Sequence, residues 1–488
     1  MGSLFPVRGG VHPDYRKGLT SEKAIVAMAM PELLYLPLQQ HVGAPAQLLV
    51  AAGERVRKGQ MIARCDGAIS APLHAPTSGL IKDIAEITAP HPSGLAQTTV
   101  VLEPDGLDEW TNLPEPIPDP LNADPQVIRE RVANSGIVGM GGAVFPAAVK
   151  LNLGSQYKIE TLLVNGAECE PYVTCDDRVM REYASEVIDG ARIMAHVMGA
   201  AKIIVGIERN KPQAIEAMTR AAAPYAEITV IGVPAQYPMG YAHELILATT
   251  GRETPAGKRT AEVGVVAYNV GTTRAIDHAV RLGRPLISRV VTVSGGTVRE
   301  PGNIVVPIGA RVADVIAFCG GLTSQPARLI NGGPMMGQPL PSLDVPVVKG
   351  TAGILALAAS EVNDAPESPC IRCGSCVDAC PCGLVPVEMA AYIRKDNLQG
   401  AARLGVGDCI GCGSCSWVCP SHIPLVQYFQ YANGVLSDQE RERRKNARTK
   451  SLAEAHAHRL EKVVAAKAAT QAARKGAPAH TPTDKASA

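Results

Sequence analysis

Short apolar runs alternate with amphipathic stretches through the middle of the chain. The runs at 159–165, 202–207 and 227–233 have the length and the β-branched content of buried strands. The stretches at 177–197 and 212–222 repeat apolar residues at helical spacing. Because strands that alternate with helices usually pair in parallel through crossover connections, this part of the chain predicts an α/β domain with a parallel sheet.

The segments on either side of this pattern are typical of β structure. Residues 38–102 contain short β-like runs spaced by glycines and resemble a biotinyl/lipoyl-type barrel-sandwich domain. Carrier domains of that type hold a lysine at a hairpin tip, whereas the equivalent stretch 63–67 reads ARCDG, so we expect a packing or docking role. Residues 286–350 return to short strands with one helix at 310–319, which looks like a β-grasp domain of the soluble ligand-binding type.

A connector precedes the α/β pattern. Residues 103–125 are dense in proline and acidic side chains, which predicts an exposed linker. Asp124 then has the position of a helix N-cap and Pro125 that of the first helical residue. We expect this helix to run to about Asn134 and to be closed by Gly136.

Eight of the thirteen cysteines form two copies of one spacing, C-x2-C-x2-C-x3-C-P. The copies are Cys370, Cys373, Cys376, Cys380 and Pro381, then Cys409, Cys412, Cys415, Cys419 and Pro420. This is the spacing of bacterial ferredoxins with two [4Fe-4S] clusters. Two structural zinc sites are the less favoured alternative, because zinc sites usually pair C-x2-C knuckles and need neither a third evenly spaced thiolate nor the proline.

The resemblance to two-cluster ferredoxins implies crossed ligation. Carried over residue by residue, one cluster takes Cys370, Cys373, Cys376 and Cys419, and the other takes Cys409, Cys412, Cys415 and Cys380. Between the two runs, residues 387–405 predict one or two short helices. Cys382 is an extra thiol beyond the first run, and the isolated thiols are expected to be buried and inert, namely Cys65, Cys169, Cys175 and Cys319.

Composition and charge exclude several classes of function. The net charge is +1 and only 4% of residues are aromatic, so neither the charge balance nor base stacking points to nucleic acid. No apolar run reaches the roughly 18 residues of a membrane-spanning helix, and the first residues lack the apolar stretch of a secretory signal. We therefore expect a cytosolic protein with reduced thiols, in which clustered cysteines hold metal rather than form disulfides.

The last fifty residues, 437–488, are rich in alanine and basic side chains. They carry 12 Lys and Arg against 6 Asp and Glu. The favoured interpretation is a solvated helix that frays into disorder. The alternative is attachment to an acidic partner or to anionic lipid headgroups.

Glycine-rich and polar segments follow the predicted strands. GIVGMGGAVFPAAVK at 136–150 lacks the G-x-G-x-x-G of a Rossmann fingerprint, because position 144 is valine. Further segments at 162–177, 237–245 and 268–273 each lie at the end of a predicted strand. Because ligands of open α/β sheets bind at the carboxyl ends of the strands, these segments together predict a phosphate-bearing ligand there.

These segments, in this order and followed by paired ferredoxin motifs, resemble the RnfC family, one component of the Rnf ion-translocating electron transport complex. The match covers residues 8–430, and the flavin domain is similar to the NADH-binding flavoprotein of respiratory complex I. The resemblance implies that Phe145 stacks on the nucleotide and that Glu168 and Glu170 border the nicotinamide and ribose. It also implies that an FMN is lined by Gly139, Gly141, Gly142, Lys150, Asn165, Tyr237, Gly240, Asn269 and Thr272.

General chemistry agrees with this implied site. Backbone N–H groups and a lysine suit a phosphate dianion, and carboxylates suit ribose hydroxyls but would repel the extra phosphate of NADPH. Asp176 and Asp177 begin a predicted helix, so we expect them to act as N-caps. One segment departs from the family, which usually has a glutamate and a lysine shortly after the glycine of YPxG. This chain has Tyr241, Ala242, His243 and Glu244 there, so a carboxylate near the flavin is missing or displaced to Glu244.

The sequence thus predicts an α/β multidomain protein. Its expected parts are an N-terminal region with the barrel-sandwich domain (1–105), a linker (106–124), a Rossmann-like FMN/NADH-binding α/β domain (125–285), a β-grasp domain (286–358), a helical 2x[4Fe-4S] domain (359–436) and a basic tail (437–488).

The leading functional hypothesis is an electron input: NADH gives a hydride to FMN, which passes single electrons to the two [4Fe-4S] clusters. Expected partners are iron-sulfur and integral membrane subunits, with ferredoxin or flavodoxin as the eventual acceptor. The expected place is peripheral, on the cytoplasmic face of the inner membrane. Two alternatives are a soluble cobalamin-reductase-like flavoprotein with similar modules, and an electron relay or scaffold in which the altered segment no longer turns over NADH.

Overall fold

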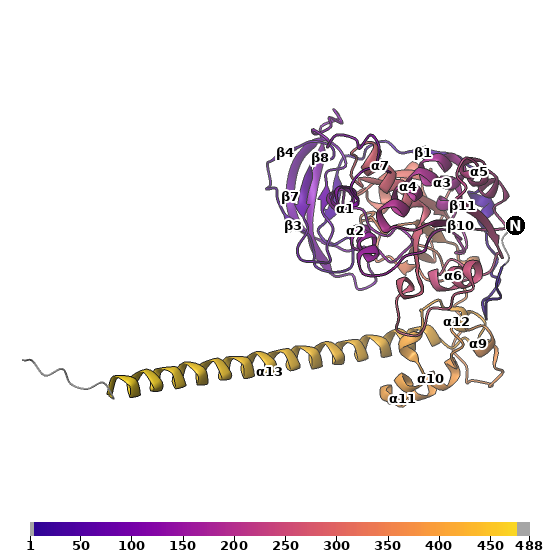
Figure 1. The fold of residues 1–488 in the computed structure, drawn as a ribbon. Helices are drawn as coiled ribbons and strands as arrows, with labels where there is room; N and C mark the ends of the chain where they lie inside the picture. The colour runs from indigo at the N-terminus through magenta and orange to yellow at the C-terminus, as the bar shows by residue number, and fades with distance from the viewer. Residues whose placement is uncertain (1–3, 476–488) are drawn as a thin grey trace, which may run out of the picture.

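The computed structural model describes residues 4–475, and its centre is a four-stranded sheet (Figure 1). The strand order is β11-β10-β9-β12, and every neighbouring pair is parallel, as predicted. The strands are β9 (Thr161–Gly166), β10 (Lys202–Glu208), β11 (Ile228–Val233) and β12 (Val265–Asn269). Successive residues of β9 face opposite sides, since Leu162 and Val164 belong to one apolar core and Leu163 to another.

Helices cover both faces of this sheet. One face packs against α4 and α7, with α3 and α5 beside α4, while α6 lies on the opposite face (Figure 1). These helices are α3 (Cys175–Glu182), α4 (Ala184–Met198), α5 (Pro212–Ala222), α6 (Ala242–Thr250) and α7 (Val270–Arg281). The single helix predicted for 177–197 is wrong, because Tyr183 leaves helical geometry at φ −128° and ψ 32°. The Arg274 guanidinium lies 3.8 Å from the centre of the Tyr183 ring, a tertiary contact that residue periodicity does not encode.

The predicted start of the first long helix is confirmed. Helix α1 spans Pro125–Asn134, and the Asp124 carboxylate accepts a hydrogen bond of 2.8 Å from the Gln126 N–H. Gly136 follows the helix with φ +66°, a left-handed conformation that glycine adopts at little cost. The short helix α2 (Ala147–Leu151) comes after the glycine-rich loop.

Two small antiparallel sheets form the barrel-sandwich domain. One has the order β2-β8-β7-β4 and the other β3-β5-β6. Their strands are β2 (Leu34–Pro37), β3 (Gln47–Leu48), β4 (Arg55–Val56), β5 (Met61–Arg64), β6 (Leu73–His74), β7 (Gly79–Thr88) and β8 (Ala96–Pro104). Cys65 is exposed, which contradicts the predicted burial, because it directly follows β5 where the chain leaves the sheet. Cys169, Cys175 and Cys319 are buried as predicted.

A six-stranded mixed sheet forms the β-grasp part, in the order β1-β14-β13-β17-β15-β16. Its elements are β1 (Ile25–Ala27), β13 (Ser288–Ser294), β14 (Gly302–Pro307), β15 (Arg328–Asn331), β16 (Gln338–Pro339), β17 (Gly353–Leu357) and α8 (Val312–Phe318). Strand β1 comes from the N-terminal region but pairs in parallel with β14. The predicted N-terminal region therefore contributes to two domains.

The cysteine runs lie in a helical domain below α6 in Figure 1. Its helices are α9 (Ser375–Asp378), α10 (Pro386–Ile393), α11 (Leu398–Arg403), α12 (Ser414–Trp417) and α13 (Leu425–Lys475). Helices α10 and α11 confirm the prediction for 387–405. Helix α13 runs through the predicted boundary at 436, and the end of the predicted tail, 476–488, lies outside the described residues. None of the helices within residues 4–475 combines the length and apolar character needed to cross a membrane.

The N-terminal segment joins the flavin-type domain to the helical domain. The Phe5 N–H donates to the Ala248 carbonyl of α6, at 3.0 Å. A few residues later Gly10 donates to the Ala379 carbonyl at 3.0 Å, and Val11 forms an antiparallel bridge with Tyr237. Residues 5–11 therefore run across the boundary between the two domains.

Candidate functional site

The predicted glycine-rich segment forms a compact loop between α1 and α2. Val138 and Pro146 form a β-bridge at its base, and the Gly139 N–H donates to the Phe145 carbonyl at 2.8 Å. Gly142 has φ +100°, and a Cβ there would meet nothing within 4 Å, so the loop is open on this side. Phe145 is half-buried at the end of the loop. Open backbone with left-handed geometry is the arrangement that lets N–H groups approach a phosphate.

The N-terminus of α7 lies directly against this loop. A Cβ on Gly141 would come within 3.2 Å of the Asn269 Cβ, so glycine is what allows the close approach. Asn269 caps α7, since its Oδ1 accepts from the Gly271 N–H at 2.8 Å. Thr272 accepts a hydrogen bond of 2.9 Å from the Met140 N–H and fixes the loop to the helix. The predicted residues Gly139, Gly141, Gly142, Asn269 and Thr272 are therefore brought together.

Lys150 supplies a cation on the same side of the sheet. Its Nζ donates to the Ala267 carbonyl of β12 and lies 4.7 Å from the centre of the Tyr268 ring. Burial lowers the pKa of Lys150 to about 8. The amine is still mostly protonated at pH 7, and a nearby phosphate dianion would favour the charged form further.

Asn165 and Gly240 meet at the carboxyl ends of β9 and β11. The Asn165 Nδ2 donates to the Gly240 carbonyl at 2.8 Å, and its Oδ1 accepts from the Ala167 N–H at 3.0 Å. A side chain at Gly240 would clash with the Ala167 carbonyl, so only glycine fits there. In the sheet register Asn165 is paired with Asn269 on β12, which places the two groups of predicted residues at one edge.

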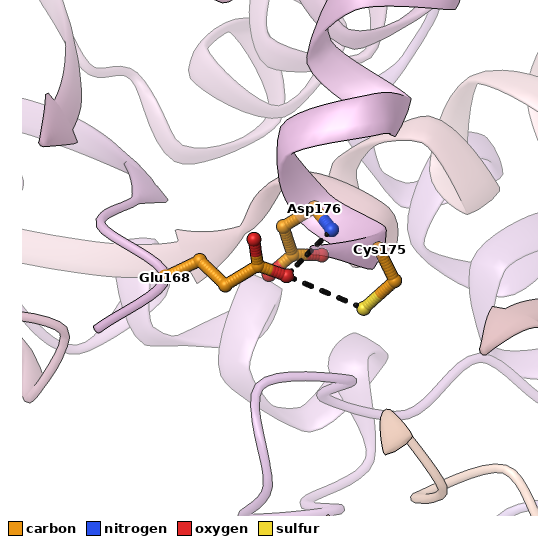
Figure 2. A group of neighbouring side chains, drawn as sticks. All are labelled: Glu168, Cys175 and Asp176. Carbon is orange, nitrogen blue, oxygen red and sulfur yellow. Dashed lines mark hydrogen bonds between the residues drawn. The ribbon is translucent and has the colours of Figure 1, made fainter. Parts of the chain in front are cut away.

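Glu168 has a structural partner that the sequence did not predict. Its Oε1 accepts from the Asp176 N–H at 2.8 Å and its Oε2 from the Asp177 N–H at 3.3 Å (Figure 2). The predicted N-capping by Asp176 and Asp177 is therefore wrong, since both lie in the first turn of α3 and their own N–H groups are capped by Glu168. Asp176 instead accepts a hydrogen bond of 2.6 Å from Asn269, and burial raises the pKa of Asp176 to about 7.

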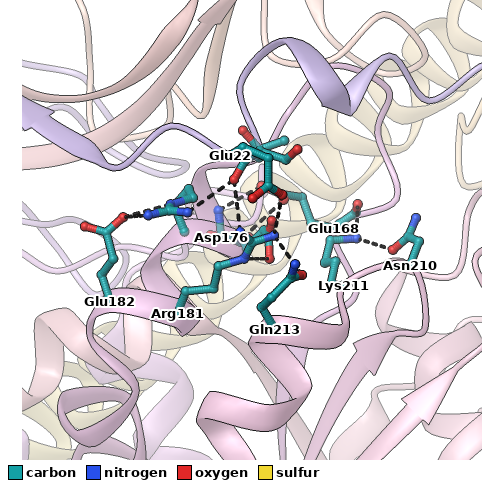
Figure 3. Close-up of polar contacts among 12 residues, drawn as sticks. Glu22, Glu168, Asp176, Arg181, Glu182, Asn210, Lys211 and Gln213 are labelled. Carbon is teal, nitrogen blue, oxygen red and sulfur yellow. Dashed lines mark hydrogen bonds and ion pairs between the residues drawn. The ribbon is translucent and has the colours of Figure 1, made fainter.

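Two lysines hold the main chain of the segment that carries Glu168, and neither was predicted. Lys211 donates to the Glu168 carbonyl at 3.1 Å and to the Glu208 carboxylate at 2.6 Å, and both side chains of this ion pair are buried (Figure 3). Lys17 donates to the carbonyls of Glu168 at 2.8 Å and Glu170 at 2.9 Å. No motif marks these lysines, because they act on backbone carbonyls of distant residues. Around them, Arg181 pairs with Asp177 and the more exposed Glu22.

Glu170 connects the same segment to the β-grasp domain. Its carboxylate accepts from the Met335 N–H at 3.0 Å and from the Met336 N–H at 2.8 Å. A side chain on Gly333 would clash with this carboxylate. Burial raises the pKa of Glu170 to about 7, although the two N–H groups favour its charged form. Both carboxylates predicted to border the nucleotide therefore already have backbone donors.

Tyr237 faces the cysteine domain rather than the glycine-rich loop. Its hydroxyl donates to the Cys412 carbonyl at 2.6 Å, and the residue is only 1% exposed. It belongs to a small apolar core with Val11, Cys169 and Ala379. The YPMG segment thus forms a direct joint between the α/β domain and the second cysteine run.

The cysteines separate into a buried set and an exposed set. One cavity is lined by Cys380, Cys409, Cys412 and Cys415, together with Cys382 and apolar residues such as Met389 and Phe429. This is one of the two sets expected from crossed ligation, with one cysteine from the first run and three from the second. In the other set Cys370 and Cys373 are exposed, whereas Cys376 and Cys419 are half-buried. All thirteen cysteines lie within the described residues as free thiols, so four thiolates are available for each predicted cluster.

The segment that departs from the family begins α6. Tyr241 precedes the helix, and its ring meets the His243 ring edge to face with centroids 5.1 Å apart. Glu244 is buried, and burial together with the nearby Glu253 charge raises the pKa of Glu244 to about 7. Ala242 is the first residue of the helix.

Comparisons with protein-family models match four parts of the chain. They are the RnfC barrel sandwich hybrid domain at residues 5–107, the Nuo51 FMN-binding domain at 132–278, the SLBB domain at 290–339 and the 4Fe-4S dicluster domain at 369–423. The predicted fold class is thereby confirmed. A flavin-binding domain and a cluster-binding domain agree with the open glycine-rich loop and with the grouped thiols described above.

Curated relatives match over most of the chain, and each is the C component of such a complex. The one from the ion-translocating oxidoreductase complex of Rhodobacter capsulatus is 54% identical over 89% of this chain and 84% of its own. The one from the proton-translocating ferredoxin:NAD(+) oxidoreductase complex of Clostridium ljungdahlii is 45% identical over 82% and 86%. The one from Yersinia pestis bv. Antiqua is 44% identical over 94% and 73%. The predicted resemblance is confirmed, and the chain belongs to the RnfC family of ion-translocating oxidoreductase complexes.

Proposed function

We propose that this protein is the subunit through which electrons from NADH pass, by way of FMN and two [4Fe-4S] clusters, to the rest of an ion-translocating complex. The observation that carries the proposal is the joint at Tyr237, whose hydroxyl donates to the Cys412 carbonyl at 2.6 Å. Through it, the loops at the carboxyl edge of the parallel sheet contact the buried cysteine set. A hydride acceptor and a one-electron carrier would therefore have adjacent sites in one chain.

The residues at the sheet edge suit an FMN. The open loop at Gly142 and the ammonium of Lys150 would bind the phosphate, and Asn269 and Thr272 hold that loop in place. When bound, FMN accepts a hydride from NADH and gives up its electrons one at a time. Phe145, Asn165 and Gly240 line the same edge in this proposal.

Glu168 and Glu170 are proposed to border the nicotinamide and ribose. Their carboxylates have backbone donors, which hold them in place and which a ribose hydroxyl would share or displace. A carboxylate in this position disfavours the extra phosphate of NADPH by like-charge repulsion. Preference for NADH over NADPH is therefore part of the proposal.

Burial gives the two cysteine sets an order. The set of Cys380, Cys409, Cys412 and Cys415 lies behind Tyr237, and Cys412 is 7% exposed. The set that includes Cys370 and Cys373 is exposed to solvent. We infer that the buried set holds the cluster nearest the flavin and that the exposed set holds the cluster from which electrons leave to a partner iron-sulfur subunit.

The printed names of the relatives support the remaining assignments. One relative belongs to a ferredoxin:NAD(+) oxidoreductase and others belong to ion-translocating complexes. We therefore propose ferredoxin or flavodoxin as the eventual electron acceptor and integral membrane subunits as partners. The proposed location is the cytoplasmic face of the inner membrane, where the protein would be peripheral.

A relay without NADH turnover is the second candidate. It is favoured by the engaged carboxylates of Glu168 and Glu170 and by Ala242 and His243 at the altered start of α6. In that case the flavin site would exchange electrons only with the clusters. The two candidates differ in a single observable, the direct reduction of the flavin by NADH.

Anaerobic stopped-flow mixing of the flavin-loaded protein with NADH distinguishes them. We expect NADH to bleach the flavin absorbance and to act at lower concentration than NADPH. Glu170→Ala should weaken this preference, and Lys150→Ala should lower flavin occupancy. If dithionite bleaches the flavin while saturating NADH leaves it oxidised, the relay is correct and the NADH input is wrong.

Iron and sulfide analysis tests the clusters separately. Two cubanes correspond to about eight iron and eight sulfide per chain after anaerobic purification. Crossed ligation predicts that Cys419→Ala and Cys373→Ala remove the same EPR signal, although the two residues belong to different runs. Two zinc ions without sulfide would contradict the cluster assignment.

A further inference from the structure

Helix α13 leaves the body of the protein and continues as an isolated arm (Figure 1). Its first turns pack into the cysteine domain, where Phe429 is 1% exposed and Ala432 is buried. From 441 to 472 every described residue is exposed. The arm therefore has no packing partner within residues 4–475, and its side chains alone determine its surface chemistry.

Basic side chains concentrate on one face of the arm. At 3.6 residues per turn, six of them fall within an arc of about 100°. They are Arg441, Arg444, Lys445, Arg448, Arg459 and Lys462, and we call this set the basic stripe. Within 441–472 the acidic residues Glu442, Glu454 and Glu461 all lie outside that arc. At about 1.5 Å per residue the stripe is about 32 Å long.

Most of the stripe is free of intramolecular ion pairs. Arg441 pairs with Asp438, and Arg444 with Glu440 at 2.7 Å, both near the base of the arm. In the described structure no carboxylate pairs with Lys445, Arg448, Arg459 or Lys462. Exposed apolar side chains accompany them on the same arc, with Leu452 57% and Val463 50% exposed.

We propose that the basic stripe binds the anionic headgroups of a lipid membrane, with α13 lying along the surface. A straight row of cations about 32 Å long matches a flat, diffuse field of negative charge. Leu452 and Val463 could enter the headgroup boundary beside it, as apolar residues of interfacial helices do. A protein partner is disfavoured because 441–472 contains no Trp, Tyr or Phe, the anchors that usually dominate protein interfaces.

This proposal does not depend on NADH or flavin chemistry. It rests on the exposure and the charge distribution of α13, and membership in a family of ion-translocating complexes places a membrane nearby. Sedimentation of the full chain with lipid vesicles tests it directly. The vesicles contain either phosphatidylcholine alone or phosphatidylcholine with anionic phosphatidylglycerol.

A matched pair of variants separates the stripe from total charge. Lys445→Gln with Arg448→Gln removes two cations from the stripe, whereas Arg443→Gln with Lys450→Gln removes two from the opposite side. At about 1 kcal/mol per basic residue near an anionic surface, the stripe variant should partition about 30-fold less onto anionic vesicles. The control variant should change partitioning by less than about threefold, because its cations point away from the surface.

Salt and membrane composition complete the test. Binding of the unaltered chain should be lost in about 1 M salt, where the Debye length is about 3 Å. Circular dichroism and flavin reduction should be unchanged in both variants. Equal binding to neutral vesicles, or equal loss in the two variants, overturns the proposal. Binding only to membranes that hold the other subunits also overturns it and assigns the stripe to a protein surface.

Discussion

The joint at Tyr237 gives the most direct test of how the two domains are held together. Tyr237→Phe removes one hydroxyl and leaves the ring in place. The lost hydrogen bond to the Cys412 carbonyl is 2.6 Å long, and Tyr237 is 1% exposed, so water does not replace the donor. The buried carbonyl of Cys412 is then unsatisfied.

The magnitude follows from the cost of an unsatisfied buried acceptor. That cost is about 1–3 kcal/mol, which corresponds to a factor of about 5–150 in the equilibrium constant for opening the joint. The amides that close the joint should therefore exchange with solvent faster by a factor in this range. They include the N–H groups of Gly10 and Val11, which donate across the boundary to Ala379 and Tyr237.

Hydrogen exchange measured by mass spectrometry on peptides covering 5–15 and 405–420 provides the assay. Tyr241→Phe is the matched control, because it is the same substitution in the same loop, on a side chain that is only half-buried. We expect the control to leave these rates unchanged. If Tyr237→Phe exchanges at the rate of the unaltered protein, the hydroxyl does not hold the joint and the reasoning is refuted.

Three further predictions concern other contacts. Gly9→Ala should displace Cys380, since Gly9 has φ +58° and a Cβ would lie 2.6 Å from the Cys380 carbonyl carbon; iron should fall toward about four per chain, while Gly53→Ala, with open space around it, keeps about eight. Glu168→Gln should lower the unfolding free energy by about 1 kcal/mol in chemical denaturation because a charged cap of α3 is lost, and an unchanged midpoint would contradict this. Burial lowers the pKa of Lys349 to about 7, so the unfolded chain binds more protons above pH 7; stability should rise with pH by up to about 1.4 kcal/mol per pH unit, and Lys349→Met should flatten the thermal-melt profile.

Local patterns were sufficient for much of the fold and for the cluster chemistry. Helix α5 has the bounds that apolar spacing predicted, and Asp124 caps α1 as its position before Pro125 indicated. The eight cysteines were identified because cluster ligation imposes a short, regular spacing along the chain. In each case the physical cause acts within a few residues, so the sequence by itself contains it.

The tertiary structure alone decided the partners of the polar side chains at the site. Glu168 caps α3, Glu170 reaches the β-grasp domain, and Tyr237 faces Cys412. The same holds for strand β1, which leaves the N-terminal region to pair with β14. Periodicity shows that a residue is buried or exposed but not which distant segment packs against it. These contacts depend on how the domains pack together, so only the folded arrangement of the chain could reveal them.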